Sequence, residues 1–453
     1  MKTLLVLAVV VFIAFAVKKE DLITEDLPGC GHWNFDAYSG YIPVDNKNKF
    51  HYMFVESQNN PQTDPLLIWF TGGPGCSSML AFFMEHGTCV WDGLDPNELP
   101  HNNEYSWNAK ANVLYIENPA GVGFNVGYQG EYLDDEIAGD QEEAFILNWF
   151  NEFPEFKAND LYITGESYGG IYVPYLAYRL HEDGLTTKSG GDIKLVGIAV
   201  GNGVTDWSVD GTPAYVEMSW YHGLIPRTLK ETIDKNDCQF RDVGEKPLSS
   251  ECKKAFKEWE TFVEGINVYD VYKSPQDGGL MEPKLSVERM LSDDFSQAGY
   301  ASFLKSNYNK LPVNSQLTKY LDRDDIRKIL HVTEKSGSFQ PCVNFNYKML
   351  EKATLWIYPT LKEGGYRILK YSGDTDGAVP TYGTEKWIDQ LNWTLKQEHR
   401  PFYIDNKVAG YLEIRDGLDF LVFHGVGHLV PLWMRKESQF ALYTWIENGK
   451  FPY

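Results

Sequence analysis

A serine at position 167 is the first residue of this chain whose surroundings suggest chemistry. It lies in Gly165-Glu166-Ser167-Tyr168-Gly169, a G-x-S-x-G pattern that directly follows a short β-rich run at residues 161–164. In a nucleophile elbow of this kind, a sharp turn between a strand and a helix holds the serine hydroxyl clear of the backbone. Taken alone the pattern is weak, because a chain of this length meets it by chance roughly one time in ten, and a glycine-rich turn would look the same.

Two later loops supply the partners that a serine nucleophile requires. A serine hydroxyl needs a histidine base, which is oriented in turn by a carboxylate, and in the α/β-hydrolase fold they follow in the order Ser, Asp, His. The motif GDTDGAVP contains Asp374 and Asp376, and the motif HGVGHLVP contains His424 and His428. Asp376 lies farther beyond its predicted strand than Asp374, and His428 lies deeper in its loop than His424. We therefore predict a triad of Ser167, Asp376 and His428.

A glycine-rich loop is the fourth element of the predicted site. The motif WFTGGPGCSS at residues 69–78 begins at the end of the β-rich run at 66–70. Such a loop can turn backbone N–H groups inward, which is what a tetrahedral oxyanion requires. We assign the oxyanion hole to the N–H groups of Gly73 and Tyr168. A phosphate-binding loop is excluded, because no Gly-Lys-Ser/Thr follows.

The elements that must position these residues alternate between strands and helices. Helical periodicity fills residues 140–150 and 172–181, and β-rich runs recur at 66–70, 111–116, 161–164, 195–200, 367–371 and 418–423. This alternation predicts an α/β fold with a mostly parallel sheet covered by helices on both faces. The predicted triad follows the carboxyl ends of three strands, where open α/β sheets bind their ligands.

The alternation stops between about residues 207 and 324, where the chain becomes charged and helix-forming. We expect a largely helical, cap-like insertion at 207–324 that divides one α/β-hydrolase core into a first part, 17–206, and a second part, 325–453. Residues 1–16 have the short charged start, the apolar run and the A-x-A site of a secretory signal peptide, with cleavage expected after Ala16. A signal anchor is the alternative, but the run is shorter than the roughly 20 apolar residues that span a bilayer.

The composition argues against several other classes of function and indicates the cellular compartment. The formal charge of −22 argues against nucleic-acid partners, and it would suit work at low pH. No C-x-x-C pair or histidine cluster suggests a metal site, and we expect no cofactor. Six cysteines favour three disulfides in an oxidising compartment, although fifteen pairings are open. Asn392, in Asn-Trp-Thr, is a candidate glycosylation site. We expect a mature protein without a membrane span, in the lysosome or vacuole or secreted.

Several motifs together resemble the serine carboxypeptidases, a family of secreted and lysosomal or vacuolar exopeptidases with the α/β-hydrolase fold. The matching blocks span nearly the whole mature chain in order, and they are WFTGGPGCSS, NPAGVGF, GESYGG, GNG, GDTDGAVP and GVGHLVP. The resemblance implies removal of single residues from the C-termini of peptides or proteins, with Ser167, Asp376 and His428 as the triad.

The resemblance also implies which residues read the substrate's C-terminal carboxylate. Two acids would take part, Glu166 beside the nucleophile and Glu85 beyond the glycine-rich loop. Because ionised acids repel a carboxylate, at least one of the two must hold a proton and donate it. The family usually has Asn where this chain has Thr71, so a hydroxyl replaces an amide, and the N–H of Gly72 and Trp69 could assist.

Three disulfides follow from the same resemblance, Cys76–Cys342, Cys238–Cys252 and Cys30–Cys89. Two other functions are compatible with the scaffold. An acyltransferase would pass the acyl group to an alcohol instead of water, and a protective or binding protein of lysosomal complexes would need no catalysis. The two acids that read a carboxylate favour a peptidase, and the complete triad favours an enzyme.

Overall fold

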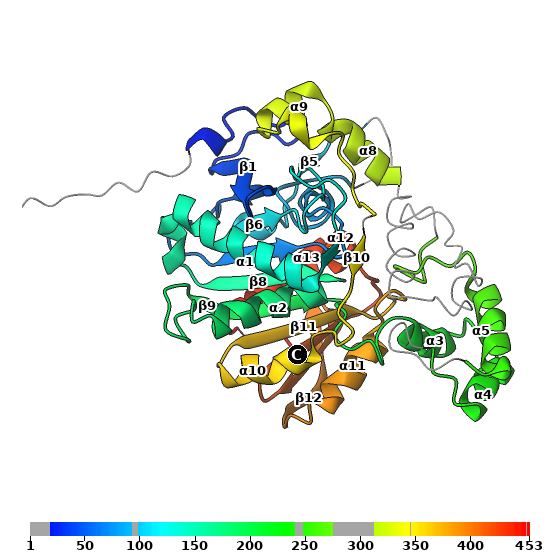
Figure 1. The fold of residues 1–453 in the computed structure, drawn as a ribbon. Coiled ribbons are helices and arrows are strands. Elements are labelled where there is room, and N and C mark those ends of the chain that lie inside the picture. Colours follow the sequence, from blue (N-terminus) through cyan, green and yellow to red (C-terminus); the bar gives the residue numbers. More distant parts are fainter. Residues whose placement is uncertain (1–18, 93–97, 241–247, 275–311, 345, 450) are drawn as a thin grey trace, which may run out of the picture.

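A single sheet of ten strands organises the molecule (Figure 1). The computed structural model describes residues 19–92, 98–240, 248–274, 312–344, 346–449 and 451–453, so the expected signal peptide lies outside the described residues. In spatial order the strands are β1 (Ala37–Pro43), β2 (Lys49–Val55), β6 (Asn112–Ile116), β3 (Leu66–Phe70), β8 (Leu161–Glu166), β9 (Leu195–Gly201), β11 (Arg367–Gly373), β14 (Leu418–Phe423), β13 (Lys407–Arg415) and β12 (Leu395–Ile404).

The six central strands, from β6 to β14, are parallel. They are the same six β-rich runs that the sequence predicts, and the bounds of β3 and β14 agree to the residue. Their apolar residues are buried on both faces, as a parallel sheet covered by helices requires. The predicted α/β-hydrolase architecture is therefore confirmed.

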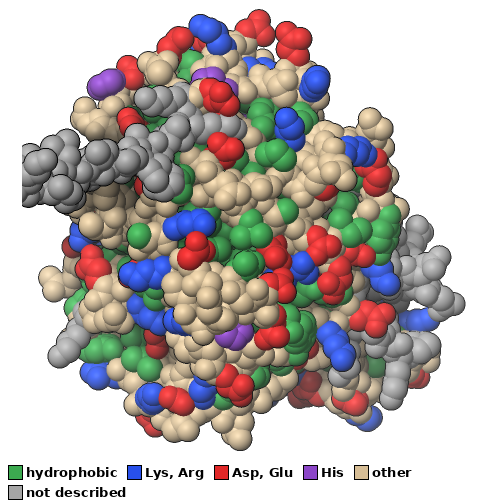
Figure 2. Space-filling view, turned by 60° about the vertical axis from the view of Figure 1, so that its left-hand side comes forward, with side chains coloured by type: hydrophobic (Ala, Val, Ile, Leu, Met, Phe, Trp, Pro, Cys, Tyr) green, Lys and Arg blue, Asp and Glu red, His purple; other side chains and the backbone are tan. Residues whose placement is uncertain are grey.

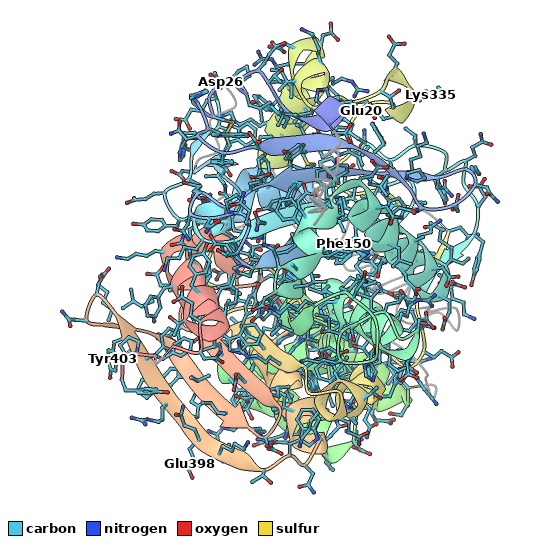
Figure 3. The ribbon with its side chains drawn as sticks, turned by 90° about the vertical axis from the view of Figure 1, so that its left-hand side faces the viewer. Glu20, Asp26, Phe150, Lys335, Glu398 and Tyr403 are labelled. Atoms are coloured by element: carbon cyan, nitrogen blue, oxygen red, sulfur yellow. A yellow bond between two sulfur atoms is a disulfide. The ribbon has the colours of Figure 1, made fainter. Side chains whose placement is uncertain are left out.

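Two antiparallel strands flank this parallel centre on each side, and the sequence prediction did not include them. At one edge of the sheet, β12 exposes most of its residues and carries charges along its length. Figure 3 shows Glu398 and Tyr403 on this strand, at the free edge of the sheet. Charged side chains of this kind discourage other chains from pairing with an open edge.

Strand side chains alternate between two apolar cores, one on each face of the sheet. In β8, Leu161 and Ile163 pack on one side, and Tyr162 packs on the other. The first core is covered by α1 (Asp135–Glu152), α2 (Gly169–Glu182), α10 (Tyr358–Glu363) and α11 (Thr381–Gln390). The second is covered by α13 (Arg435–Ile446) and a short π-helix, η2 (Ala81–Glu85). By this alternation Glu166 faces the side of η2.

The described residues between 207 and 324 contain helices and no strand. They form α3 (Thr212–Tyr221), α4 (Arg227–Lys235), α5 (Ser250–Val263) and α8 (Pro312–Leu321), followed by α9 (Asp324–Ile329). Figure 1 shows α4 and α5 beside the sheet rather than on either face of it. The division into two core parts and an insertion stays a prediction, because only part of the segment is described.

Three disulfides connect Cys30 with Cys89, Cys76 with Cys342, and Cys238 with Cys252. These are the pairs that the family resemblance implies. Within the described part of the chain, no helix is both long and apolar enough to cross a bilayer. On the face in Figure 2, acidic and basic side chains are interspersed, so the net negative charge does not gather there in one patch.

Candidate active site

Ser167 lies at the turn between β8 and α2, as the elbow motif predicts. Its φ of 59° is in the left-handed region, which is strained for a residue with a Cβ atom. Three backbone hydrogen bonds hold this conformation: the Ser167 N–H donates to the Gly201 carbonyl at 3.0 Å, and the Ser167 carbonyl accepts from the N–H groups of Gly170 at 3.0 Å and Val204 at 3.1 Å. The turn therefore fixes the serine at the carboxyl end of the sheet.

Asp376 and His428 lie beyond the ends of β11 and β14 and are buried together. Nδ1 of His428 is 2.8 Å from Oδ2 of Asp376. The carboxylate also accepts hydrogen bonds from Asn202 Nδ2 at 2.8 Å, the Ala378 N–H at 2.7 Å and the Val379 N–H at 3.0 Å. Because an ionised aspartate can only accept, His428 must donate from Nδ1, which leaves Nε2 as the basic nitrogen.

The neighbouring aspartate and histidine form a separate pair near the surface. His424 Nδ1 is 2.6 Å from Asp374 Oδ2, and Asp374 Oδ1 accepts the Gly425 N–H at 2.7 Å. The His424 side chain is 59% exposed, whereas that of His428 is 1% exposed. Asp374 thus holds the histidine loop in place.

The described residues show no hydrogen bond between Ser167 and His428. Ser167 and His428 both follow the carboxyl ends of strands, at the same end of the sheet. The end of β9 connects their surroundings, because the Gly201 carbonyl accepts the Ser167 N–H and Asn202 donates to Asp376. Nucleophile and base are often farther apart without substrate than in the reacting complex. The arrangement can support acyl transfer once the Ser167 hydroxyl comes within hydrogen-bond distance of His428 Nε2.

The segment 268–271, which follows α5, contacts both loops of the aspartate and the histidine. The His428 N–H donates to the Tyr269 carbonyl at 2.7 Å, and the Gly377 N–H donates to the Val268 carbonyl at 2.8 Å. The Tyr269 and His428 rings lie 5.0 Å apart between centroids. A Cβ at Gly427 would lie 1.8 Å from the Tyr269 carbonyl oxygen, so only glycine permits this approach. The predicted insertion therefore contributes to the walls of the site.

The glycine-rich loop lies directly against the elbow. A Cβ at Gly72 would lie 2.4 Å from the backbone nitrogen of Tyr168 and 2.6 Å from Cβ of Ser167. Among the described residues, neither the Gly73 amide nor the Tyr168 amide donates to another backbone group. Two free N–H groups on adjoining segments beside a serine are what an oxyanion hole requires.

A disulfide and two backbone hydrogen bonds connect the glycine-rich loop with residues 341–343. Cys76 is bonded to Cys342, the Ser77 N–H donates to the Pro341 carbonyl at 2.8 Å, and the Val343 N–H donates to the Gly75 carbonyl at 2.9 Å. The loop is therefore fixed to the chain segment at 341–343, far away in sequence.

Glu85 and Glu166 form a buried carboxyl pair next to the serine. Each side chain is about 1% exposed. Burial raises the pKa of Glu85 to about 8, while a hydrogen bond with Glu166 and the charge of Arg435 oppose the rise. Burial, then the charge of Glu85 and the hydrogen bond to it, raise the pKa of Glu166 well above its usual value. No described group donates a hydrogen bond to either oxygen of Glu85, and burial beside a second acid favours the protonated, neutral form.

Thr71 and Trp69, at the start of the glycine-rich loop, are joined by a hydrogen bond. Trp69 Nε1 donates to Thr71 Oγ1 at 2.9 Å, and the Thr71 N–H donates to Ser78 Oγ at 3.2 Å. Because Thr71 Oγ1 already accepts a hydrogen bond, its own O–H is left to donate. The indole N–H of Trp69 therefore orients Thr71 and does not itself point to a ligand.

Comparison with known proteins places the chain in a family. A family model described as serine carboxypeptidase matches residues 28–448. The chain belongs to the serine carboxypeptidase family. The lysosomal protective protein of Mus musculus is 33% identical over 94% of this chain and 93% of its own length. Serine carboxypeptidase-like 31 of Arabidopsis thaliana is 33% identical over 96% of this chain and 90% of its own.

A solved carboxypeptidase structure also superposes on the chain. The prohormone-processing carboxypeptidase Kex1(delta)p from Saccharomyces cerevisiae matches with a TM-score of 0.72 at 20% identity, over 95% of this chain and 96% of that one. This likeness supports the α/β-hydrolase fold. The protein is thus a hydrolase of the serine carboxypeptidase family, whose substrates are peptides.

Two residues of the site lie outside the sequence prediction. Asn202 orients Asp376, and its left-handed φ of 40° at a strand end is a backbone position that asparagine tolerates well, so the GNG motif carried a signal for it. Arg435 donates to the carbonyls of Met84 at 2.7 Å and Glu85 at 3.0 Å, which fixes the end of η2. Nothing local in the sequence indicates this contact.

Asn392, the candidate glycosylation site, is exposed in a turn after α11. Thr394 is exposed as well, so the sequon is accessible. The turn precedes the open edge strand β12. A glycan at this position stays a prediction.

Proposed function

We propose that the protein is a serine carboxypeptidase that releases single residues from the C-termini of peptides at acidic pH through an acyl-enzyme intermediate. One observation carries the proposal: two acids, Glu85 and Glu166, are fully buried, Glu166 directly precedes the candidate nucleophile, and burial raises the pKa values of both. The free carboxylate at the C-terminus of a peptide can accept a hydrogen bond from a protonated acid of this pair.

The first half of the reaction is acylation. Ser167 Oγ attacks the carbonyl carbon of the last peptide bond while His428 Nε2 takes the hydroxyl proton, and Asp376 stabilises the imidazolium that results. The N–H groups of Gly73 and Tyr168 receive the negative oxygen of the tetrahedral intermediate. His428 then donates the proton to the leaving amine, which departs as a free amino acid.

Deacylation uses the same groups in reverse. A water molecule occupies the place of the leaving amine, His428 Nε2 takes its proton, and hydroxide attacks the acyl ester. The second tetrahedral intermediate collapses, the proton returns to Ser167 Oγ, and the shortened peptide leaves with a new carboxylate.

Recognition of the C-terminus falls to the groups beside the elbow. The proton held by Glu85 and Glu166 and the hydroxyl of Thr71 donate to the two oxygens of the substrate carboxylate, and the Gly72 N–H adds a backbone donor. Trp69 acts through Thr71, because its indole N–H holds the Thr71 oxygen. Burial strengthens each of these bonds, since water does not compete for the charge.

A blocked dipeptide with a free C-terminus tests the proposal. The protein should release the C-terminal amino acid, and Ser167→Ala should lower the rate about 10⁴-fold or more, as loss of a serine nucleophile does elsewhere. Chromatography of the products distinguishes removal of the last residue from internal cleavage. Release of the acyl group onto an added alcohol, with no free acid formed, would instead indicate an acyltransferase.

A compartment of the secretory pathway fits this activity, and we propose the lysosome or vacuole, or secretion. Three disulfides are typical of proteins that mature in an oxidising compartment. The mouse relative is named as a lysosomal protein. Carboxyl groups with raised pKa values keep their protons in an acidic lumen.

A further inference from the structure

Asp135, the first residue of α1, is a buried carboxylate with no part in the mechanism above. Its side chain is only 2% exposed, yet it receives three donors from two other regions of the chain. Oδ1 accepts the Tyr168 hydroxyl at 2.8 Å and the Tyr347 hydroxyl at 2.6 Å. Oδ2 accepts the Leu350 N–H at 2.6 Å and lies 3.1 Å from the Tyr168 hydroxyl.

Tyr168 is the residue whose backbone N–H we place in the oxyanion hole. The backbone N–H of Tyr168 is thus directed toward the substrate, and its side-chain hydroxyl binds Asp135. Between them the ring packs against Tyr172 at 5.2 Å and Trp207 at 6.4 Å between centroids. A ring fixed at its far end and on its faces leaves the backbone of that residue little freedom to rotate.

The other donor of the hole is tied to the same region of the chain. The glycine-rich loop that carries Gly73 is joined to residues 341–343 through Cys76–Cys342. Tyr347 and Leu350, which bind Asp135, follow shortly after that segment. Asp135 is thus the junction at which the supports of both N–H groups meet.

We propose that Asp135 is a positioning residue of the oxyanion hole, which acts by holding the hydroxyl of Tyr168 and thereby the direction of the Tyr168 N–H. The inference rests on the proposed acyl-transfer function. Its physical basis is that a donor stabilises an oxyanion only within a narrow range of distance and angle. A misplacement of about 1 Å can cost about 10²-fold in rate.

Tyr168→Phe is the most direct test, because it removes one oxygen and keeps the backbone N–H. We expect a roughly tenfold loss in the rate of acylation by an ester substrate, with KM nearly unchanged, since the donor is displaced rather than deleted. The affinity of a peptide aldehyde, which forms a tetrahedral adduct with the serine, should fall by the same factor. Binding of the free amino acid product should not change.

Asp135→Asn and the double variant complete the cycle. Because both changes weaken the contact between Asp135 and the Tyr168 hydroxyl, their effects on the acylation rate should overlap, and the double variant should acylate little more slowly than the slower single variant. Tyr52→Phe is the matched control: its hydroxyl donates to Asp21 at 2.8 Å, also between buried side chains, but on β2 away from the site. It should lower thermal stability and leave the acylation rate at the wild-type value.

Two outcomes overturn the inference. The first is that Tyr168→Phe acylates as fast as the wild type. The second is that the acylation rate of the double variant falls by the product of the two single-variant factors. The Tyr168→Phe measurement does not depend on the other variant, so it still tests the proposal if Asp135→Asn fails to fold. Either outcome is distinct from failure of the proposed function, in which the wild type itself, compared with Ser167→Ala, shows no serine-dependent release.

Discussion

Oδ2 of Asp376 lies 2.8 Å from Nδ1 of His428, and both side chains are withdrawn from water. The same two residue types meet again close by, where Asp374 and His424 pair at 2.6 Å with most of the histidine exposed. The two pairs have similar contacts but different surroundings. A buried carboxylate can stabilise an imidazolium far better than an exposed one, because water does not screen the charges.

The two aspartates therefore predict different mutational effects. Asp376→Asn should lower kcat about 10⁴-fold with little change in fold, because the amide no longer fixes the histidine in the right tautomer. Asp374→Asn, the matched control two residues earlier, should lower kcat far less, because the amide oxygen can still accept the Gly425 N–H. Steady-state kinetics on a blocked dipeptide compares them. Similar losses in both variants would mean that the buried pair has no special role.

The carboxyl pair predicts a pH dependence that is specific to substrates with a free C-terminus. The raised pKa of Glu85, about 8, means that the pair carries its full complement of protons at acidic pH and begins to lose it as pH rises toward 8. KM for a peptide should therefore rise across this window. KM for the corresponding peptide amide, which has no carboxylate, should stay nearly constant.

Glu166→Gln separates this effect from titration of the triad. An amide cannot ionise, so the variant should bind peptides more weakly at acidic pH and lose much of the rise in KM toward pH 8. The control is the acylation rate with the peptide amide, which should keep its wild-type pH profile. Identical KM profiles for peptide and amide in the wild type would contradict a shared-proton role.

Arg435 predicts a change in binding without a change in chemistry. Its guanidinium holds the Glu85 carbonyl at 3.0 Å and the Trp91 carbonyl at 2.9 Å, so Arg435→Ala should loosen η2 and the position of Glu85. We expect KM for peptides to rise about tenfold, the size of one hydrogen bond to a charged group. Lys436→Ala is the control, because Lys436 pairs with Asp405 at the exposed surface. Its KM should match the wild type, and a tenfold fall in kcat in Arg435→Ala would contradict the assignment.

Glu117 predicts how stability changes with pH. It is fully buried, accepts hydrogen bonds from Ser77 Oγ and the Phe124 N–H, and lies 3.7 Å from His51 Nδ1. Burial raises its pKa to about 8, above the value of an unfolded glutamate. The folded state thus binds a proton that the unfolded state releases, so this stability is complete below about pH 4.5 and is lost as pH rises to about 8.

Glu117→Gln should flatten that dependence. Between pH 4.5 and 8 the wild type should lose on the order of a few kcal/mol of unfolding free energy that the variant does not lose. Thermal or urea unfolding at several pH values measures the difference. Equal slopes in both proteins would show that the glutamate is ionised when folded.

The centre of the sheet was predictable because parallel strands are buried on both faces and leave continuous apolar runs. Leu66–Phe70 is such a run, with every residue buried. The edge strand Leu395–Ile404 has no comparable signal, since it is mostly exposed and is shaped by pairing with its neighbour. The start of α1 was placed at residue 140, five residues late, because its cap, Asp134, binds the Ile137 N–H and precedes the apolar periodicity.

The site divides in the same way. Ser167, Asp376 and His428 lie in local motifs whose geometry is largely set by the strand that precedes them. Arg435 and Asp135 act across the fold, and no pattern in their own neighbourhoods indicates which carbonyl or hydroxyl they will meet. Contacts of this kind follow only from the packing of distant segments.

The Cys76–Cys342 bond has a topological consequence. Its sulfurs join residues 266 positions apart, so it encloses the elbow and residues 207–324 in one covalent ring. A single cut anywhere in that ring yields two polypeptides that migrate separately only after reduction. The bond also cannot close during synthesis until about three quarters of the chain has emerged. The glycine-rich loop is therefore joined to residues 341–343 only after most of the chain has been synthesised.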